Sequence, residues 1–213
     1  MSAATTNSPR VTIEMELSPN TYHFSSPRPP TLSFVLTSQA TQCLTILVPH
    51  SSPLAIGRSM NIGGYPISDL STSPPTAVKI GDMTGYISVP ASPNELIVLQ
   101  PGQRSKRFQV AFNRGGSYEP SFRPQPWHIV RKGRLLDQDG NETSIRRPSV
   151  VHGVDGLEAG KTYKTTMAMD KLEKTPWWWG DEKDEPDRKD LGGKVGGIEW
   201  EIVDGGVEFR VEE

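Results

Sequence analysis

The residues in this chain best suited to binding chemistry are three consecutive tryptophans, Trp177, Trp178 and Trp179. If the segment is extended, Trp177 and Trp179 share one face and Trp178 takes the other, because side chains alternate along a strand. Each indole offers a large apolar area and one N–H donor. The triplet therefore fits an aromatic platform for a sugar, an extended peptide or a flat metabolite. It also fits a core-filling role, because a domain poor in large aliphatic residues needs aromatic bulk.

No other cluster of reactive residue types forms a recognisable catalytic or metal-binding motif. The segment Asp137–Glu142 resembles part of a calcium loop, but with Gly140 at the sixth position the first and twelfth would be Leu135 and Arg146, which cannot bind calcium. We expect a hairpin turn there, no metal site and no cofactor. The chain has neither a nucleophile elbow nor a phosphate loop. No two of its histidines have the spacing of a chelate: His23, His50, His128 and His152.

Cys43 is the single cysteine of the chain, so it cannot form an internal disulfide. This composition favours a reduced, cytoplasmic location. Because Cys43 lies in an apolar segment, we expect it to be buried and inert. The polar N-terminus lacks the apolar core of a signal peptide, and no window approaches a membrane span.

The charge of the chain gives little support for a nucleic-acid partner. The net charge is −2, close to neutral. Residues 102–134 carry eight basic side chains and one acidic one, which could suit nucleic acid or an anionic metabolite. Alternating strands, however, expose charged faces to solvent in any case. We therefore do not expect nucleic acid as a partner.

Hydrophobic alternation predicts many short strands, and the longest of them have clear faces. Val11, Ile13, Met15 and Leu17 share one face of the first strand, from Arg10 to Leu17. Thr31–Ser38 and Cys43–Val48 are predicted to form a hairpin. Further strands are expected in these segments: Tyr86–Val89, Glu95–Leu99, Lys106–Asn113, Trp127–Val130 and Leu135–Leu136 around a Lys132-Gly133 turn, and Tyr163–Met169.

The C-terminal segment has the most regular pattern. Ile198, Trp200 and Ile202 alternate with charged residues, and the alternation resumes at Val207 after Asp204-Gly205-Gly206. The glycines supply the positive φ angles of a tight turn. The pattern predicts an antiparallel hairpin with one buried face.

These elements predict a single all-β domain. Residues 1–9 are expected to be a disordered leader, and residues 10–213 an antiparallel immunoglobulin-like β-sandwich with long loops. A small closed barrel is the alternative. The segment Pro49–Ala77 is expected to be a long loop with at most one short strand, and residues 181–197 a charged excursion.

Several short motifs also suggest a family. Pro30–Ser38, Leu99-Gln100-Pro101-Gly102, Leu157–Tyr163 and Trp177–Gly180 have the order of a known layout. The chain resembles a group of uncharacterised fungal intracellular immunoglobulin-like β-sandwich proteins. It is similar to the non-catalytic sandwich domain of deuterolysin-type metalloproteases and to bacterial intracellular proteinase-inhibitor sandwiches. The resemblance implies a sandwich and no settled activity. Protease activity does not carry over, because the chain lacks a His-Glu-x-x-His segment.

Two classes of function remain open from the sequence. One is a non-enzymatic binding module that uses loops or an exposed strand edge to bind a protein partner or a small-molecule ligand. The other is an accessory enzyme, a cyclase or isomerase of small-molecule, secondary-metabolite biosynthesis, working in an apolar pocket. Catalytic residues and oligomeric state are not predicted. The candidate ligand-binding residues are Trp177, Trp178, Trp179, Trp127, His128 and Tyr22.

Overall fold

The computed structural model describes residues 8–26, 28–49, 51–78, 96–112, 129–131, 134–136, 156–181, 183 and 196–213. Most of the predicted leader, the Tyr86–Val89 strand, the Asp137–Glu142 turn and most of the charged excursion fall outside these residues. In the described part, the leader's last residue, Pro9, is buried, and its carbonyl accepts a hydrogen bond from Glu199 N–H at 2.8 Å.

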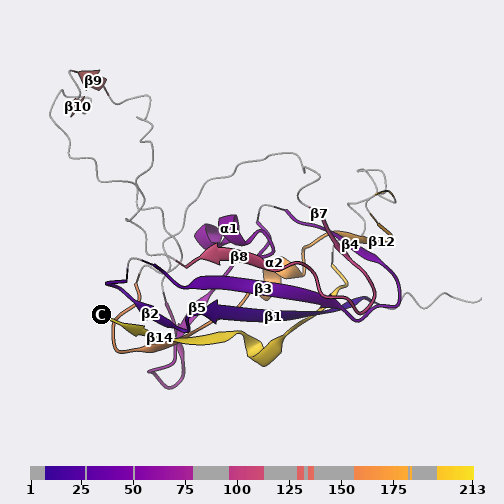
Figure 1. Cartoon of the computed structure of the whole chain (residues 1–213), viewed down its shortest axis with the longest axis horizontal. Helices are drawn as coiled ribbons and strands as arrows, with labels where there is room; N and C mark the ends of the chain where they lie inside the picture. Colours follow the sequence, from indigo (N-terminus) through magenta and orange to yellow (C-terminus); the bar gives the residue numbers. More distant parts are fainter. Residues whose placement is uncertain are drawn as a thin grey trace, which may run out of the picture.

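One sheet, sheet A, contains the long N-terminal strand. Its strand order is β13-β1-β3-β8 (Figure 1). β1 and β3 pair antiparallel along their whole length, from Val11 opposite Ser38 to Ser18 opposite Thr31. Val11, Ile13 and Leu17 are buried, which confirms the predicted inner face of the first strand. The bounds are β1 Arg10–Ser18, β3 Thr31–Ser38, β8 Phe108–Ala111 and β13 Glu199–Ile202.

Two further sheets complete the core. Sheet B has the order β2-β14-β11-β5-β6, and sheet C the order β12-β4-β7. β9 (Ile129–Arg131) and β10 (Arg134–Leu136) form the predicted hairpin. The bounds in sheet B are β2 Thr21–His23, β5 Ile67–Asp69, β6 Thr76–Ala77, β11 Thr162–Thr165 and β14 Val207–Glu212, and those in sheet C are β4 Leu44–Leu47, β7 Leu96–Leu99 and β12 Trp177–Trp179.

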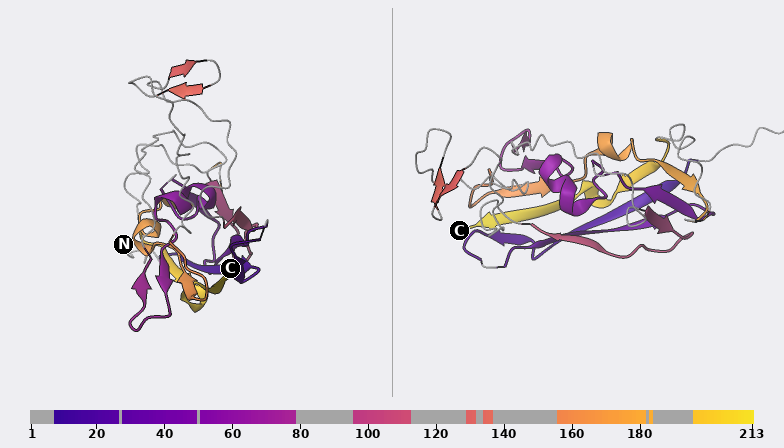
Figure 2. Two further views of the ribbon diagram at one scale, coloured as in Figure 1. Left: turned by 90° about the vertical axis from the view of Figure 1, so that its left-hand side faces the viewer. Right: turned by 90° about the horizontal axis from the view of Figure 1, so that it is seen from above.

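The three sheets enclose one hydrophobic core. Phe34 of sheet A, Phe209 of sheet B and Leu44 of sheet C belong to the same buried cluster. Figure 2 shows the long strands of sheet A on one side and those of sheet B on the other. In the described part of the chain each sheet ends in two different strands, so none closes into a barrel. The prediction of an all-β sandwich is confirmed, although its sheets are mixed and not purely antiparallel.

The predicted C-terminal hairpin is wrong in its pairing. Its two strands exist, but β13 pairs parallel with β1, whereas β14 pairs antiparallel with β11 and parallel with β2. Between them, the 3-10 turn η5 (Val203–Gly205) includes Asp204 at φ 54°, and Gly206 follows at φ 122° and ψ −160°. These positive φ angles allow the chain to turn out of sheet A and enter sheet B. Alternation identifies a buried face, but it does not identify the strand's neighbour.

The predicted pairing of Thr31–Ser38 with Cys43–Val48 is also wrong. β3 pairs with β1 and β8, and β4 pairs with β12 and β7. The short connection between β3 and β4 therefore crosses from sheet A to sheet C. Cys43, just before β4, is half-buried and not fully buried as expected.

The Pro49–Ala77 segment contains more structure than predicted. It holds β5, β6, the helix α1 (Ile56–Ser59) and the 3-10 turn η1 (Met60–Ile62). Its scattered apolar residues are buried in the core because the segment packs over it: Leu54, Ile56, Met60, Tyr65 and Ile67. The apolar residues of this segment are too widely spaced to form a helix or strand pattern, so the sequence did not predict that they enter the core.

Ion pairs cover the outer face of sheet A. Arg104 bonds Glu14 at 2.6 Å, and Arg107 bonds both Glu16 and, at 2.9 Å, the Ser33 hydroxyl. These long side chains lie over β3, where Ser33 is 3% exposed. Arg104 and Arg107 are thus paired with acids of β1.

A buried carboxylate joins β5 to the turn before β11. Asp69 accepts hydrogen bonds from Ser71 N–H at 2.8 Å and from Lys161 Nζ at 3.0 Å. Lys161 also pairs with Glu158 at 3.0 Å. The Ser71 hydrogen bond, and then Lys161, lower the pKa of Asp69 below its ordinary value of 3.8. The charged form is therefore favoured by folding.

This depressed pKa predicts an acid-dependent loss of stability. A carboxyl group whose pKa is lower in the folded state stabilises the protein above its unfolded pKa, and that contribution is lost as pH falls through the folded pKa. We expect the free energy of unfolding of the wild type to fall below about pH 4, the ordinary pKa of aspartate. Asp69→Asn should flatten this fall, measured by urea unfolding between neutral and acidic pH. An equally steep fall in Asp69→Asn would contradict the assignment to Asp69.

Candidate functional site

The tryptophan triplet forms β12, the end strand of sheet C in the described part of the chain (Figure 1). The preceding helix α2 (Met169–Leu172) ends in a turn in which Thr175 N–H bonds the Leu172 carbonyl at 3.0 Å. Pro176 cannot continue a helix, so the chain becomes extended. The triplet is therefore extended, which is the condition under which Trp177 and Trp179 share one face.

The two faces of β12 have different environments. Trp177 lies opposite Ile46 and Trp179 opposite Leu44, on the core side of sheet C. Both indoles are half-buried, and they meet edge to face with ring centroids 5.2 Å apart. Trp178 points to the other face and is 2% exposed. The strand thus combines the buried Trp178 with a pair of half-buried indoles.

Two of the three indole N–H groups have partners. Trp177 Nε1 donates to the Gly196 carbonyl at 2.7 Å, and Trp178 Nε1 donates to the Asp181 carbonyl at 3.2 Å. Trp179 Nε1 makes no hydrogen bond to the described part of the chain. This N–H is therefore a donor that a ligand carbonyl could use.

Among the described residues, one edge of β12 has no neighbouring strand. Leu47 N–H donates to the Pro176 carbonyl and Gly180 N–H to the Cys43 carbonyl, both at 2.9 Å. In an antiparallel ladder, alternate residues bond the neighbouring strand, so Trp178 also bonds β4. The N–H and C=O groups of Trp177 and Trp179 consequently point away from β4. No strand among the described residues pairs with them.

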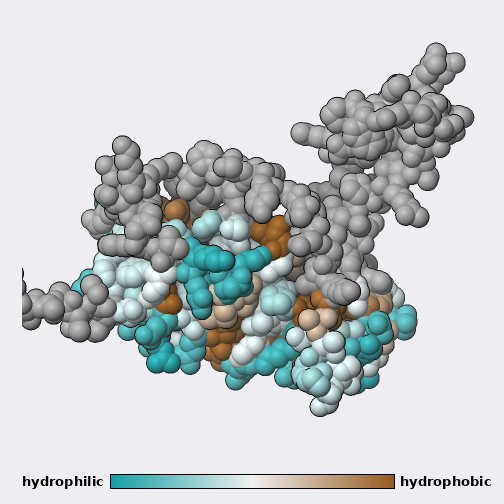
Figure 3. All heavy atoms as spheres, turned by 180° about the vertical axis from the view of Figure 1, so that it is seen from behind, coloured by the Kyte–Doolittle hydropathy of each residue, from teal (hydrophilic) through white to brown (hydrophobic). Residues whose placement is uncertain are grey.

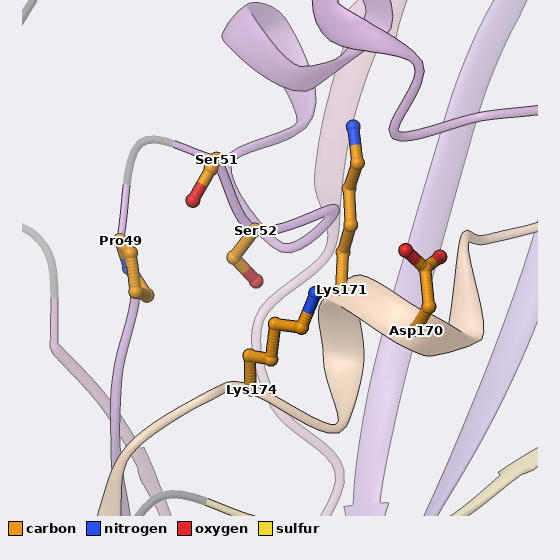
Figure 4. Close-up of a pocket in the computed structure, with 6 residues that line it drawn as sticks. All are labelled: Pro49, Ser51, Ser52, Asp170, Lys171 and Lys174. Carbon is orange, nitrogen blue, oxygen red and sulfur yellow. The ribbon is translucent and has the colours of Figure 1, made fainter.

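Two surface depressions lie elsewhere. One of about 200 Å³ lies between the segment after β4 and helix α2 (Figure 4). Lys171 there bonds the Ile62 carbonyl, and Figure 4 shows Asp170 on the side of the helix away from Ser51 and Ser52. The other, of about 330 Å³, lies on the outer face of sheet A beside Arg107 and Glu16. None of the predicted site residues lines either depression.

The structure does not gather the predicted site residues into one place. Tyr22 lies in β2, is 5% exposed, and packs edge to face against Phe24 and Phe112. β2 and β12 lie at opposite ends of the sandwich in Figure 1. Trp127 and His128 fall outside the described residues. The candidate site is therefore the edge of β12 alone.

Sequence analysis found the triplet but missed its position at a sheet edge. The available signal was its length, because a three-residue strand bounded by Pro176 and Gly180 is typical of an edge strand. In the ranges that the structure describes, no three His, Cys, Asp or Glu side chains could hold a metal ion together. No helix in those ranges is long and apolar enough to cross a membrane.

The surface of the described part has few exposed large apolar side chains. Met169 and Val203 are the exposed ones, at 39% and 38%. Figure 3 shows hydrophobic residues in separate small patches on the visible face. The edge of β12 is thus distinguished by its backbone groups and indoles and not by a broad apolar surface.

Comparison with known proteins gives no further identification. No protein family, curated protein or solved structure matches this chain. The resemblance to fungal immunoglobulin-like sandwich proteins therefore stays a prediction. The functional argument rests on the geometry of β12.

Proposed function

We propose that this chain is a non-enzymatic interaction module that binds an extended segment of a protein along the edge of β12. The observation that supports it is the outward direction of the N–H and C=O groups of Trp177 and Trp179. An extended segment that adds to a sheet edge gains backbone hydrogen bonds from such groups. This way of binding, by addition of a strand to a sheet edge, does not require a reactive side chain.

The two half-buried indoles give this edge a side-chain preference. Trp177 and Trp179 share one face, so they would contact alternate side chains of an added strand. Aromatic or β-branched residues at those positions would pack best, because cross-strand aromatic pairs stabilise sheets. We therefore expect the ligand to be an extended, apolar-alternating segment. The buried Trp178 would hold the strand in place.

A matched pair of substitutions tests the edge directly. Trp179→Ala and Trp179→Pro both remove the indole, but only proline removes the outward N–H. Proline at this position leaves the β4 ladder intact and is tolerated on edge strands. Peptides selected against the wild-type chain from a random display library serve as the probe. We expect Trp179→Pro to bind them about tenfold more weakly than Trp179→Ala, because one hydrogen bond is lost.

Hydrogen exchange locates the binding in the same experiment. The amides of Trp177 and Trp179 should become protected when a selected peptide binds, because they would donate to it. Equal affinity of the two variants, together with unchanged exchange at these amides, would contradict the proposed function. Unfolding curves of both variants serve as the control for folding.

A further inference from the structure

The depression of about 200 Å³ beside helix α2 is lined by residue types that suit an anion. It lies between the segment that follows β4 and α2, and none of its lining residues belongs to β12 (Figure 4). At about 30 Å³ for each water molecule, the space holds several waters or one small ion. Its polar side chains are those of Ser51, Ser52, Asp170, Lys171 and Lys174.

Helical spacing separates the charges of this region onto two sides. The turn continues past α2, because Lys174 N–H bonds the Lys171 carbonyl at 3.3 Å. Residues three apart in such a turn are neighbours, so Lys171 and Lys174 share one side, and Asp170 and Glu173 share another. Asp170 borders the depression, but its carboxylate lies on the side of α2 away from the two serines (Figure 4). The charge beside the serines is therefore positive.

Neither lysine is neutralised by an acid among the described residues. Lys171 Nζ donates to the Ile62 carbonyl, which carries no net charge. Lys174 is exposed, and its Nζ has no hydrogen-bond or ion-pair partner in the described part of the chain. Like charges at this spacing repel one another. An anion bound beside both lysines would remove that repulsion.

Two buried hydroxyl groups at the depression share a single contact. Ser52 and Thr175 are 2% and 1% exposed, and their hydroxyl oxygens lie 3.5 Å apart. Ser52 Oγ also accepts a hydrogen bond from Leu54 N–H at 3.3 Å. The pair has two O–H protons, but within the described residues only one of them has an acceptor, which is the other hydroxyl. A buried donor without an acceptor is costly. When Thr175 donates to Ser52, the Ser52 proton is available to a ligand in the depression.

We propose that this depression binds a phosphate group, held by Lys174, Ser51 and Ser52, with Lys171 adding positive charge. The three donors come from two separate segments of the chain. They suit the three free oxygens of a phosphate monoester better than the two oxygens of a carboxylate, and hydrogen bonds to a charged acceptor are the stronger ones. The site is separate from the edge of β12 and does not depend on the proposed function. Ser51 and Lys174 are exposed, so a phosphate group reaches them from solvent as the free ion or as a small ester.

The experiment titrates the full chain with sodium phosphate at neutral pH and follows backbone amides by NMR. Sodium chloride keeps the ionic strength constant, because salt screens exposed charges. The amides of Ser51, Ser52 and Lys174 should shift in a saturable way. Lys174→Gln should raise the dissociation constant about threefold, the effect of losing one exposed ion pair. Lys106→Gln is the matched control, because it removes the same charge from an exposed lysine outside the depression, and it should leave the dissociation constant unchanged.

Ser52→Ala tests the buried donor. It should raise the dissociation constant for phosphate about tenfold, because a hydrogen bond to a charged group is lost. Unfolding curves of the variants serve as the control for folding, and Lys174→Gln decides the question if Ser52→Ala does not fold.

A second titration with glycerol 3-phosphate distinguishes the two sources of the group. Equal affinity for both probes would assign the site to the free ion, and tighter binding of glycerol 3-phosphate would assign it to an ester. The absence of a saturable shift at these amides with either probe would overturn the inference. Equal weakening by Lys106→Gln and Lys174→Gln would overturn it as well, because the effect would then come from net charge alone.

Discussion

Replacing Gly206 with alanine is expected to destabilise the fold by about 3 kcal/mol or more, because it adds a steric clash to a backbone conformation that only glycine adopts readily. Gly206 has φ 122° and ψ −160°. A Cβ atom there would lie 2.2 Å from the Thr165 carbonyl oxygen of β11. This close approach is where the chain enters sheet B. Urea unfolding followed by tryptophan fluorescence would measure the change.

Gly205→Ala is the matched control. Gly205 also has a positive φ, 64°, but its Cβ would meet only the flexible end of Lys164 at 3.4 Å. The expected cost is about 1 kcal/mol, the ordinary penalty for a side chain in the left-handed region. If the two alanine variants lost equal stability, the close approach to Thr165 would not be the cause.

The second large effect is expected at the centre of the tryptophan triplet. Trp178→Ala should lower the free energy of unfolding by about 3–5 kcal/mol, because it leaves a large cavity in a buried region. Trp178 is 2% exposed. The variant also loses the hydrogen bond from Nε1 to the Asp181 carbonyl. Denaturant unfolding at neutral pH would measure the loss.

Trp177→Ala provides the comparison within the same strand. Trp177 is half-buried, and its Nε1 bonds the Gly196 carbonyl at 2.7 Å, so we expect a loss of about 1–2 kcal/mol. Its stronger effect should be on binding to the edge of β12. If Trp177→Ala lowered the free energy of unfolding more than Trp178→Ala, the assignment of Trp178 as the buried anchor and of Trp177 as a binding residue would be wrong.

The sequence predicted the faces of strands better than their partners. The alternation of Val11, Ile13 and Leu17 marked the inner face of β1 because one face of that strand is buried. No comparable pattern in the sequence identifies the neighbouring strand, since almost every residue type offers the same backbone hydrogen-bonding groups. The chain therefore crosses between sheets at Asp204–Gly206, where the local pattern predicted a hairpin.

The sequence named Trp177, Trp178 and Trp179 as candidate binding residues, but it did not indicate that they lie at the edge of a sheet. The spacing of Trp177 and Trp179 gave their common face correctly, because it depends only on local geometry. The open edge of β12 depends on which strands are absent beside it in the described part of the chain, and this is a property of the tertiary fold. For the same reason, the separation of Tyr22 from the triplet could not be read from the chain.

The pairing of the first described strand with a late one affects how the protein folds during synthesis. β13 borders β1, and β14 lies between β2 and β11. Because β13 and β14 are translated last among the described strands, the nascent polypeptide reaches the end of this region with earlier strands still lacking neighbours. Such non-local closure is slow. The unfinished intermediate exposes apolar surface to the ribosomal environment, so chaperones should engage it until these residues emerge.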